Sequence, residues 1–306
     1  GNTINNNQIQ AANGTLYCMR GTTSLYTVRE NNANNNKIIN TSSTSASSVF
    51  GYSNAGSPTS ESIFENDIYD LSIEGAGTST ASSITGINLN TSSSSVKNIN
   101  NNRIRNLQFL NSSTGAATII GISQSLATTA SIYSNKIYDL IATNGAASVV
   151  RGIQISSGST TNVYNNLIGN LQASASTSGD ALRGINITST TTLSNLNISY
   201  NSIYINGTSS GSGFGSQGLF HTYNATASTA SLIMKNNIIA NTSTPSGAGI
   251  TSAFRRSSST DLNNYNTSSN NNLFYAGTPS ATNLIYTDGT NNDQTLAAFK
   301  SRVSPR

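Results

Sequence analysis

One short phrase recurs along the chain at nearly regular intervals. It reads "ENDIYDL" from Glu65, "NNRIRNL" from Asn101 and "SNKIYDL" from Ser134. Each version carries an Asn followed two residues later by Ile or Phe, and nine such anchors span the chain, at Asn7, Asn36, Asn66, Asn102, Asn135, Asn166, Asn201, Asn237 and Asn272. Their spacings are 29, 30, 36, 33, 31, 35, 36 and 35 residues. A repeat period of about 20 to 50 residues is typical of a solenoid, in which each repeat packs only on its neighbours.

Each period contains three short segments that resemble β-strands, separated by turns rich in Ser, Thr, Gly and Asn. Apolar residues within these segments alternate, as Ile153 and Ile155 do, which places them on one face of a pleated strand. We therefore predict an all-β fold, a single-domain right-handed parallel β-helix that covers residues 1–306 in about nine coils. At about 4.8 Å per coil its length is roughly 43 Å. A helical period occurs only within Asp293–Arg302, so we expect residues 293–306 to form a loop or short helix that caps the last coil.

Stacking of the coils places equivalent residues directly above one another. The anchors should therefore form a column, and a column of Asn amides can donate and accept hydrogen bonds along its length at a tight turn. We predict a structural ladder made of Asn66, Asn102, Asn135, Asn166, Asn201, Asn237 and Asn272. Ligand or ion coordination by the same amide oxygens is the functional alternative.

Two further columns are expected from the same stacking. The Ile or Phe two residues after each anchor should form an apolar column inside the coils, and burial of each side chain should contribute about 1.5 to 3 kcal/mol to stability. A second column of glycines, Gly51, Gly86, Gly121, Gly152 and Gly184, should allow a sharp bend into the following strand.

The composition excludes several classes of function. Only 8% of the residues are charged, against about 25% in an average soluble protein. The 15 basic and 11 acidic side chains are scattered singly, so we expect no partner among nucleic acids. Cys18 and His221 are each the only residue of their kind, and we therefore expect no internal disulfide, no metal site and no cofactor. No apolar run reaches the roughly 18 residues of a membrane-spanning helix. The low charge favours an extracellular or cell-surface location.

Parallel β-helices also carry polysaccharide lyases and hydrolases, which need acidic and basic groups gathered on one face. The best catalytic candidates are Asp70 and Asp139, four residues after their anchors and two coils apart, about 9.6 Å along the axis. Inverting glycosidases use carboxyl groups roughly 6.5 to 9.5 Å apart, so the match is marginal. The structural alternative, which we favour, is that these residues serve a turn.

Four residues are candidates for ligand binding. Arg151 and Arg183 should stack in adjacent coils, where they could contact a glycan or simply form part of an exposed surface. Tyr69 and Tyr138 should point outward from equivalent positions, and aromatic rings stack on sugars, but Arg105 interrupts their column. Packing of exposed tyrosines across strands is the commoner explanation. The threonines collect in loop runs and not in ranks, so an ice-binding face is not expected.

Together with the C-terminal "DQTLAAFKSRVSPR", the repeat resembles the right-handed β-helix regions of large secreted surface proteins of Bacteroidota, many of them adhesin-like and exported by type IX secretion. The resemblance implies an extracellular rod, and no catalytic residue is carried over from it.

The chain begins with Gly1 and not Met, so we expect a processed product or a segment of a longer polypeptide or assembly. We expect a non-enzymatic structural or adhesive protein, with surface glycans or cell-surface proteins as partners and no membrane span. The alternative is a carbohydrate-active enzyme or carbohydrate-binding module. The sequence leaves the ligand, the oligomeric state and the source open.

Overall fold

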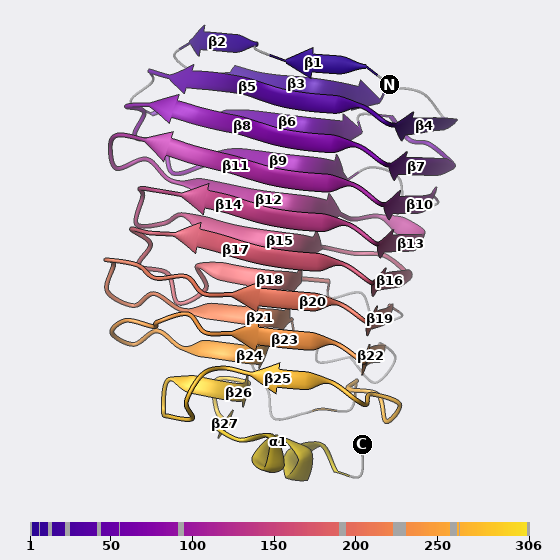
Figure 1. The fold of residues 1–306 in the computed structure, drawn as a ribbon, viewed down its shortest axis with the longest axis vertical. Coiled ribbons are helices and arrows are strands. Elements are labelled where there is room, and N and C mark those ends of the chain that lie inside the picture. Colours follow the sequence, from indigo (N-terminus) through magenta and orange to yellow (C-terminus); the bar gives the residue numbers. More distant parts are fainter. Residues whose placement is uncertain are drawn as a thin grey trace.

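The computed structural model of the chain is a parallel β-solenoid whose stacked coils form three sheets, called A, B and C (Figure 1). It describes residues 1–306 except residues 1, 6, 12–13, 22–24, 42–43, 55, 91–94, 190–193, 223–230, 258–261, 263 and 305–306. The chain passes in turn through sheets A, B and C and then begins the next coil one level further along the axis. Among the described residues, seven coils have a strand in every sheet, and two more have strands in sheets A and B. The prediction of a right-handed parallel β-helix is confirmed.

The strands of each sheet follow one another in coil order. Sheet A contains β1 (Thr3–Asn5), β2 (Gln8–Ala11), β5 (Asn32–Asn40), β8 (Asp67–Gly75), β11 (Arg103–Asn111), β14 (Lys136–Ala142), β17 (Leu167–Ala173), β20 (Ser202–Ile205), β23 (Ile238–Asn241) and β25 (Leu273–Tyr275). Sheet B contains β3 (Gly14–Gly21), β6 (Ser47–Asn54), β9 (Ser82–Leu89), β12 (Ala117–Gln124), β15 (Val149–Ile155), β18 (Leu182–Ile187), β21 (Ser216–His221), β24 (Thr251–Arg256), β26 (Asn283–Thr287) and β27 (Asn292–Asp293). Sheet C contains β4 (Leu25–Arg29), β7 (Ser60–Phe64), β10 (Ser95–Asn100), β13 (Ala127–Tyr133), β16 (Thr160–Tyr164), β19 (Asn195–Ser199) and β22 (Ser231–Lys235).

The strands pair in a register that keeps like residues together. Ile104 of β11 lies opposite Ile68 of β8 and Ile137 of β14, and all three side chains are fully buried. Because alternate residues of a strand point to opposite faces, the inward positions of the three sheets form one continuous apolar core. The outward positions of sheet A are therefore displayed on a rigid support.

The predicted asparagine ladder runs along the corner where sheet C turns into sheet A. Each Asn Oδ1 accepts hydrogen bonds from the backbone N–H and the Nδ2 of the Asn in the preceding coil, as Asn135 does from Asn102, at 3.0 Å each. The left-handed residue of the turn is the one before the ladder Asn, such as Asn101 or Ser134. The ladder position thus requires the side-chain amide of Asn, whereas the left-handed backbone conformation of the turn falls on the residue before it.

The first two predicted anchors were wrong. The ladder passes through Asn2 and Asn31, which bond to Asn31 and Asn66 in the ladder geometry. Asn7 and Asn36 form a separate pair five residues further along, with the same two hydrogen bonds at 3.1 and 2.7 Å. Asn36 lies opposite the buried Leu71, so an apolar side chain takes the equivalent place in the next coil and this second ladder ends.

The glycine column exists for a reason other than the one predicted. Gly121 does not have a positive φ; instead, a Cβ at that position would lie 2.5 Å from Cγ2 of Ile137 and 2.6 Å from the carbonyl oxygen of Gly152. Gly86 and Gly184 are confined in the same way by Ile104 and Ile203. These glycines give room to the isoleucines of sheet A that pack against sheet B.

A short helix covers the C-terminal end of the core, as the sequence indicated. Helix α1 (Leu296–Val303) begins after Thr295, whose hydroxyl accepts a hydrogen bond from the backbone N–H of Ala298. Its buried Phe299 packs edge-on against Phe274 and stacks on Tyr286, with ring centroids 5.7 and 5.1 Å apart. No helix among the described residues is long and apolar enough to cross a membrane.

Candidate functional site

The outer face of sheet A divides into a charged half and an apolar half. The residue directly after each ladder Asn points outward, and the parallel register stacks these residues in one column. From Asn32 onward the column reads Asn32, Asp67, Arg103, Lys136, Leu167, Ser202, Ile238 and Leu273. The column therefore changes from charged to mostly apolar between β14 and β17. These two strands lie about halfway along the rod (Figure 1).

The charged half is held by ion pairs between adjacent coils. Arg103 forms two hydrogen bonds with the carboxylate of Asp67, and Arg105 approaches the same carboxylate at 3.5 Å. This carboxylate raises the pKa of Arg103. Arg103 is about half exposed, whereas Asp67 and Arg105 are partly buried. Ion pairs at a protein surface contribute roughly 0 to 1 kcal/mol to stability.

Asp70 and Asp139, the catalytic candidates, lie on this face but not as a pair. Both have a positive φ, as do Asn106 and Asn170 at the same place in the following coils. The Nδ2 of Asn106 donates to Asp70, and the Nδ2 of Asn170 donates to Asp139 at 2.6 Å. Asn106 thus stands between the two carboxylates. The geometry agrees with the favoured interpretation that these residues serve a left-handed bulge.

The tyrosine column is interrupted where the sequence predicted. Tyr69, Arg105, Tyr138, Gly169 and Tyr204 stand in register along sheet A. The Arg105 guanidinium lies 3.8 Å from the ring centroid of Tyr69, so one face of that ring is already covered. Tyr69 and Tyr138 are both half-buried.

The apolar half of the face was missed by the sequence analysis. Five large apolar side chains are about half exposed there, namely Leu167, Tyr204, Ile238, Leu273 and Tyr275. The two tyrosines flank Ala240 on the same outward column. We call this set the apolar strip. Its signal was present in the sequence, because the residue after the anchor changes from charged to apolar along the chain.

Arg151 and Arg183 stand in adjacent coils as predicted, but they are buried rather than exposed. Only 7% and 6% of their surfaces are exposed, and burial lowers the pKa of both. Arg183 lies 3.4 Å from the ring centroid of Phe220 and forms an ion pair with Asp180 at 2.7 Å. The same carboxylate binds Arg255 at 2.7 Å, and the arginine charges lower its pKa against the effect of burial. The segment before β18 supplies Asp180 and so covers the arginines.

A second group of buried charges lies inside the core at the level of β7 and β10. Glu61 and Lys97 stand opposite each other and are fully buried. Glu61 accepts hydrogen bonds from Tyr52 at 2.8 Å and Asn54 at 2.9 Å, whereas Lys97 donates to two backbone carbonyls at 2.8 and 2.6 Å. Burial lowers the pKa of Lys97 to about 8, with the charge of Glu61 acting against this shift. Both side chains are enclosed and bonded to neighbouring groups of the chain, so we assign them a role in holding the core and not in binding a ligand.

The two unique residues of the chain lie apart from each other in the fold. Burial raises the pKa of the Cys18 thiol to about 12, and its hydrogen bond with Asn36 opposes the shift. His221 is buried at the end of β21, where burial and then the nearby charge of Arg256 lower its pKa to about 3. Among the described residues no group of three or more His, Cys, Asp or Glu side chains could hold a metal ion.

Comparisons of the chain with protein-family models, curated proteins and solved structures give no match. The parallel β-solenoid is therefore established by its own geometry. A fold of this kind is compatible with both adhesion and catalysis, so function has to be argued from the outer faces.

Proposed function

We propose that this protein is a non-enzymatic, extracellular adhesive rod and that the apolar strip of sheet A is its contact surface for glycans. The observation that carries the proposal is the strip itself: Leu167, Tyr204, Ile238, Leu273 and Tyr275 are 48 to 52% exposed on one flat, rigid face. Contiguous exposed apolar side chains mark interaction surfaces, and a tyrosine offers an apolar ring together with a polar hydroxyl. Sugars present a similar combination of apolar ring faces and hydroxyl groups.

Two further features support adhesion over hydrolysis. Asp70 and Asp139 each accept a hydrogen bond from an Asn amide of the next coil, and Asn106 separates them. In the charged half of the same face, the Asp67 carboxylate already engages Arg103 and Arg105. The resemblance to secreted surface proteins and the low charge of the chain are the grounds for an extracellular location.

A glycan array and a reducing-sugar release assay on the same polysaccharides test the proposal. We expect binding without sugar release. The double substitution Tyr204→Ser and Tyr275→Ser should abolish binding, whereas Tyr69→Ser, in the charged half, should leave it unchanged. Both sites lie on the outer face, so circular dichroism should report an unaltered fold.

Two results would contradict the proposal. Sugar release that disappears in Asp70→Asn or Asp139→Asn would make the protein a glycosidase or lyase. Absence of binding to every glycan would remove carbohydrate as the ligand of the strip.

A further inference from the structure

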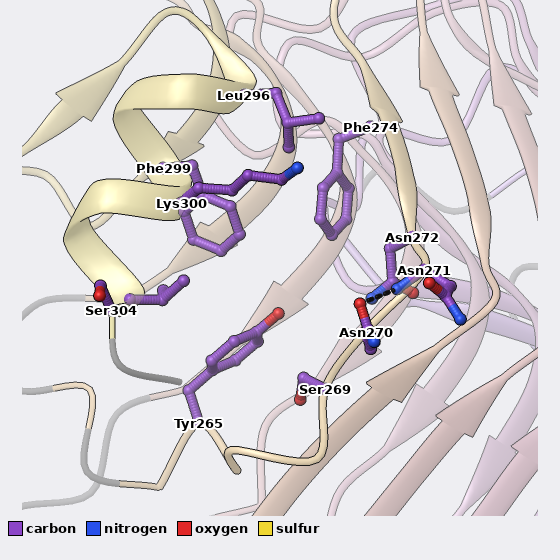
Figure 2. Close-up of a pocket in the computed structure, with 11 residues that line it drawn as sticks. Tyr265, Ser269, Asn270, Asn271, Asn272, Phe274, Leu296, Phe299, Lys300 and Ser304 are labelled. Carbon is purple, nitrogen blue, oxygen red and sulfur yellow. Dashed lines mark hydrogen bonds between the residues drawn. The ribbon is translucent and has the colours of Figure 1, made fainter.

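A cavity of about 380 Å³ lies at the C-terminal end of the rod, between helix α1 and the turn that leads into β25 (Figure 2). Its size falls within the roughly 300 to 1,000 Å³ of small-molecule sites. The turn contributes polar groups, including Asn270 and Asn272, and β25 adds the ring of Phe274 on the same side. Helix α1 contributes the ring of Phe299 from across the cavity, which therefore offers both hydrogen-bonding groups and apolar rings.

Asn272 is the last member of the ladder. The earlier members show what the backbone N–H and Nδ2 of a ladder Asn bind. In eight successive pairs, one Oδ1 accepts from the backbone N–H of the preceding Asn at 3.0 to 3.1 Å and from its Nδ2 at 2.8 to 3.4 Å. Asn272 accepts in this way from Asn237, and one of its amide hydrogens goes to the carbonyl of Met234. In the part of the chain that the structure describes, nothing accepts from its backbone N–H.

Asn272 therefore presents to the cavity the two donors that hold an oxygen atom at every other level of the ladder. Asn237, one coil earlier, is 1% exposed, whereas Asn272 is partly exposed where it lines the cavity. Charge favours an anion, because Lys300 of helix α1 also lines the cavity. A ligand oxygen at this place would repeat a geometry that the protein already forms eight times.

We propose that this cavity binds a small organic ligand through a carboxylate or carboxamide oxygen. The oxygen accepts from the backbone N–H and Nδ2 of Asn272, and the apolar part of the ligand packs against Phe274 and Phe299. Lys300 makes a carboxylate bind more tightly than the matching carboxamide. The same chemistry is offered by a free small carboxylate and by an Asn or Asp side chain of a peptide. The site is separate from the apolar strip and does not depend on it.

Titration of the ¹⁵N-labelled protein with four probes tests the proposal, with the backbone and side-chain amide signals of Asn272 as the readout. Phenylacetate and phenylacetamide carry the oxygen on an aromatic group, N-acetylasparaginamide represents the peptide source, and benzyl alcohol lacks the carbonyl oxygen. We expect phenylacetate to shift both signals with saturation and benzyl alcohol to shift neither. Stronger binding of N-acetylasparaginamide than of phenylacetate would assign the site to a peptide side chain.

Three substitutions locate the binding. Leu296→Trp should fill the cavity without touching the ladder and weaken phenylacetate binding by more than about tenfold, since the ligand loses both hydrogen bonds and packing. Ala297→Trp is the matched control, because Ala297 is the exposed next residue of the helix and does not line the cavity. Lys300→Met should weaken phenylacetate by about threefold to fivefold and leave phenylacetamide unchanged. Saturable binding that survives Leu296→Trp, or shifts confined to residues remote from Asn272, would overturn the proposal, as would no shift with any probe.

Discussion

Replacement of Asn135 by Ala should remove one rung from the middle of the ladder. Asn135 accepts from the backbone N–H and the Nδ2 of Asn102, both at 3.0 Å, and donates to the carbonyl of Ile99 at 2.9 Å and to Asn166 at 3.0 Å. The side chain is fully buried, so water does not replace these partners in the folded state. Ala would therefore abolish four hydrogen bonds and leave the backbone N–H of Asn102 without its acceptor.

The magnitude follows from these contacts. Three of the lost hydrogen bonds involve groups that keep another partner, and each contributes about 1 kcal/mol net. The orphaned N–H of Asn102 adds a desolvation penalty of about 1 to 3 kcal/mol. The local free energy of unfolding should fall by about 4 to 6 kcal/mol. A suitable control is Asn162→Ala, since Asn162 lies half-buried on the outer face of sheet C and accepts one amide hydrogen bond from Asn197, at 2.8 Å.

Native-state hydrogen exchange read by mass spectrometry is the appropriate assay, because a solenoid unfolds in parts and a single global midpoint would mix them. Peptides that cover β13 and β14 should lose protection in Asn135→Ala, whereas those from β5 and β23 should keep it. If Asn135→Ala and Asn162→Ala reduce protection equally, within about 1 kcal/mol, the ladder is not what holds adjacent coils together.

Three shorter predictions concern other positions. Gly121→Ala should lower the local unfolding free energy by several kcal/mol because its Cβ would lie 2.5 Å from Ile137, whereas Gly169→Ala, whose nearest contact is at 3.6 Å, should be neutral when both are measured by native-state hydrogen exchange. For Lys97 the folded pKa of about 8 is below the unfolded value of about 10.5, so the unfolded state binds the extra proton and stability rises with pH across that window. The unfolding free energy of the wild type relative to Lys97→Met should therefore increase by about 2 kcal/mol from pH 7 to pH 9.5, and a constant difference would contradict the lowered pKa. Cys18, with its pKa of about 12, should resist iodoacetamide at pH 8 in the folded protein and react after denaturation.

The sequence could predict the coil period and most of the ladder because both are enforced by stacking. From Asn66 onward each ladder Asn is followed two residues later by Ile or, at the last level, by Phe274. In the first coils the sequence analysis followed Asn36, which has Ile38 two residues later, whereas Asn31 has only Ala33 there. In the structure Asn31 bonds to Asn66, and the register of β5 with β8 places Ala33 opposite Ile68.

The burial of Arg151 and Arg183 could not be predicted in the same way. Alternation correctly places both outside the core, but whether an outward residue reaches water depends on the path of a loop. The segment that carries Asp180 has no repeat pattern, and it is this segment that covers Arg183. Loop geometry lies outside what period and alternation determine.

The separation of inner and outer positions also decides where function should be sought in this fold. An inner residue must match the coils on both sides, so its identity reports on packing alone. An outer residue is free of that requirement, and no change in the core accompanies the switch from charged to apolar side chains between β14 and β17. Exposed leucine and isoleucine do not contribute to stacking and reduce solubility, so packing does not account for them. Leu167, Ile238 and Leu273 occupy three of the last four positions of the column, with Ser202 between the first two. Together with Tyr204 and Tyr275 they favour a contact surface at the C-terminal half of the rod.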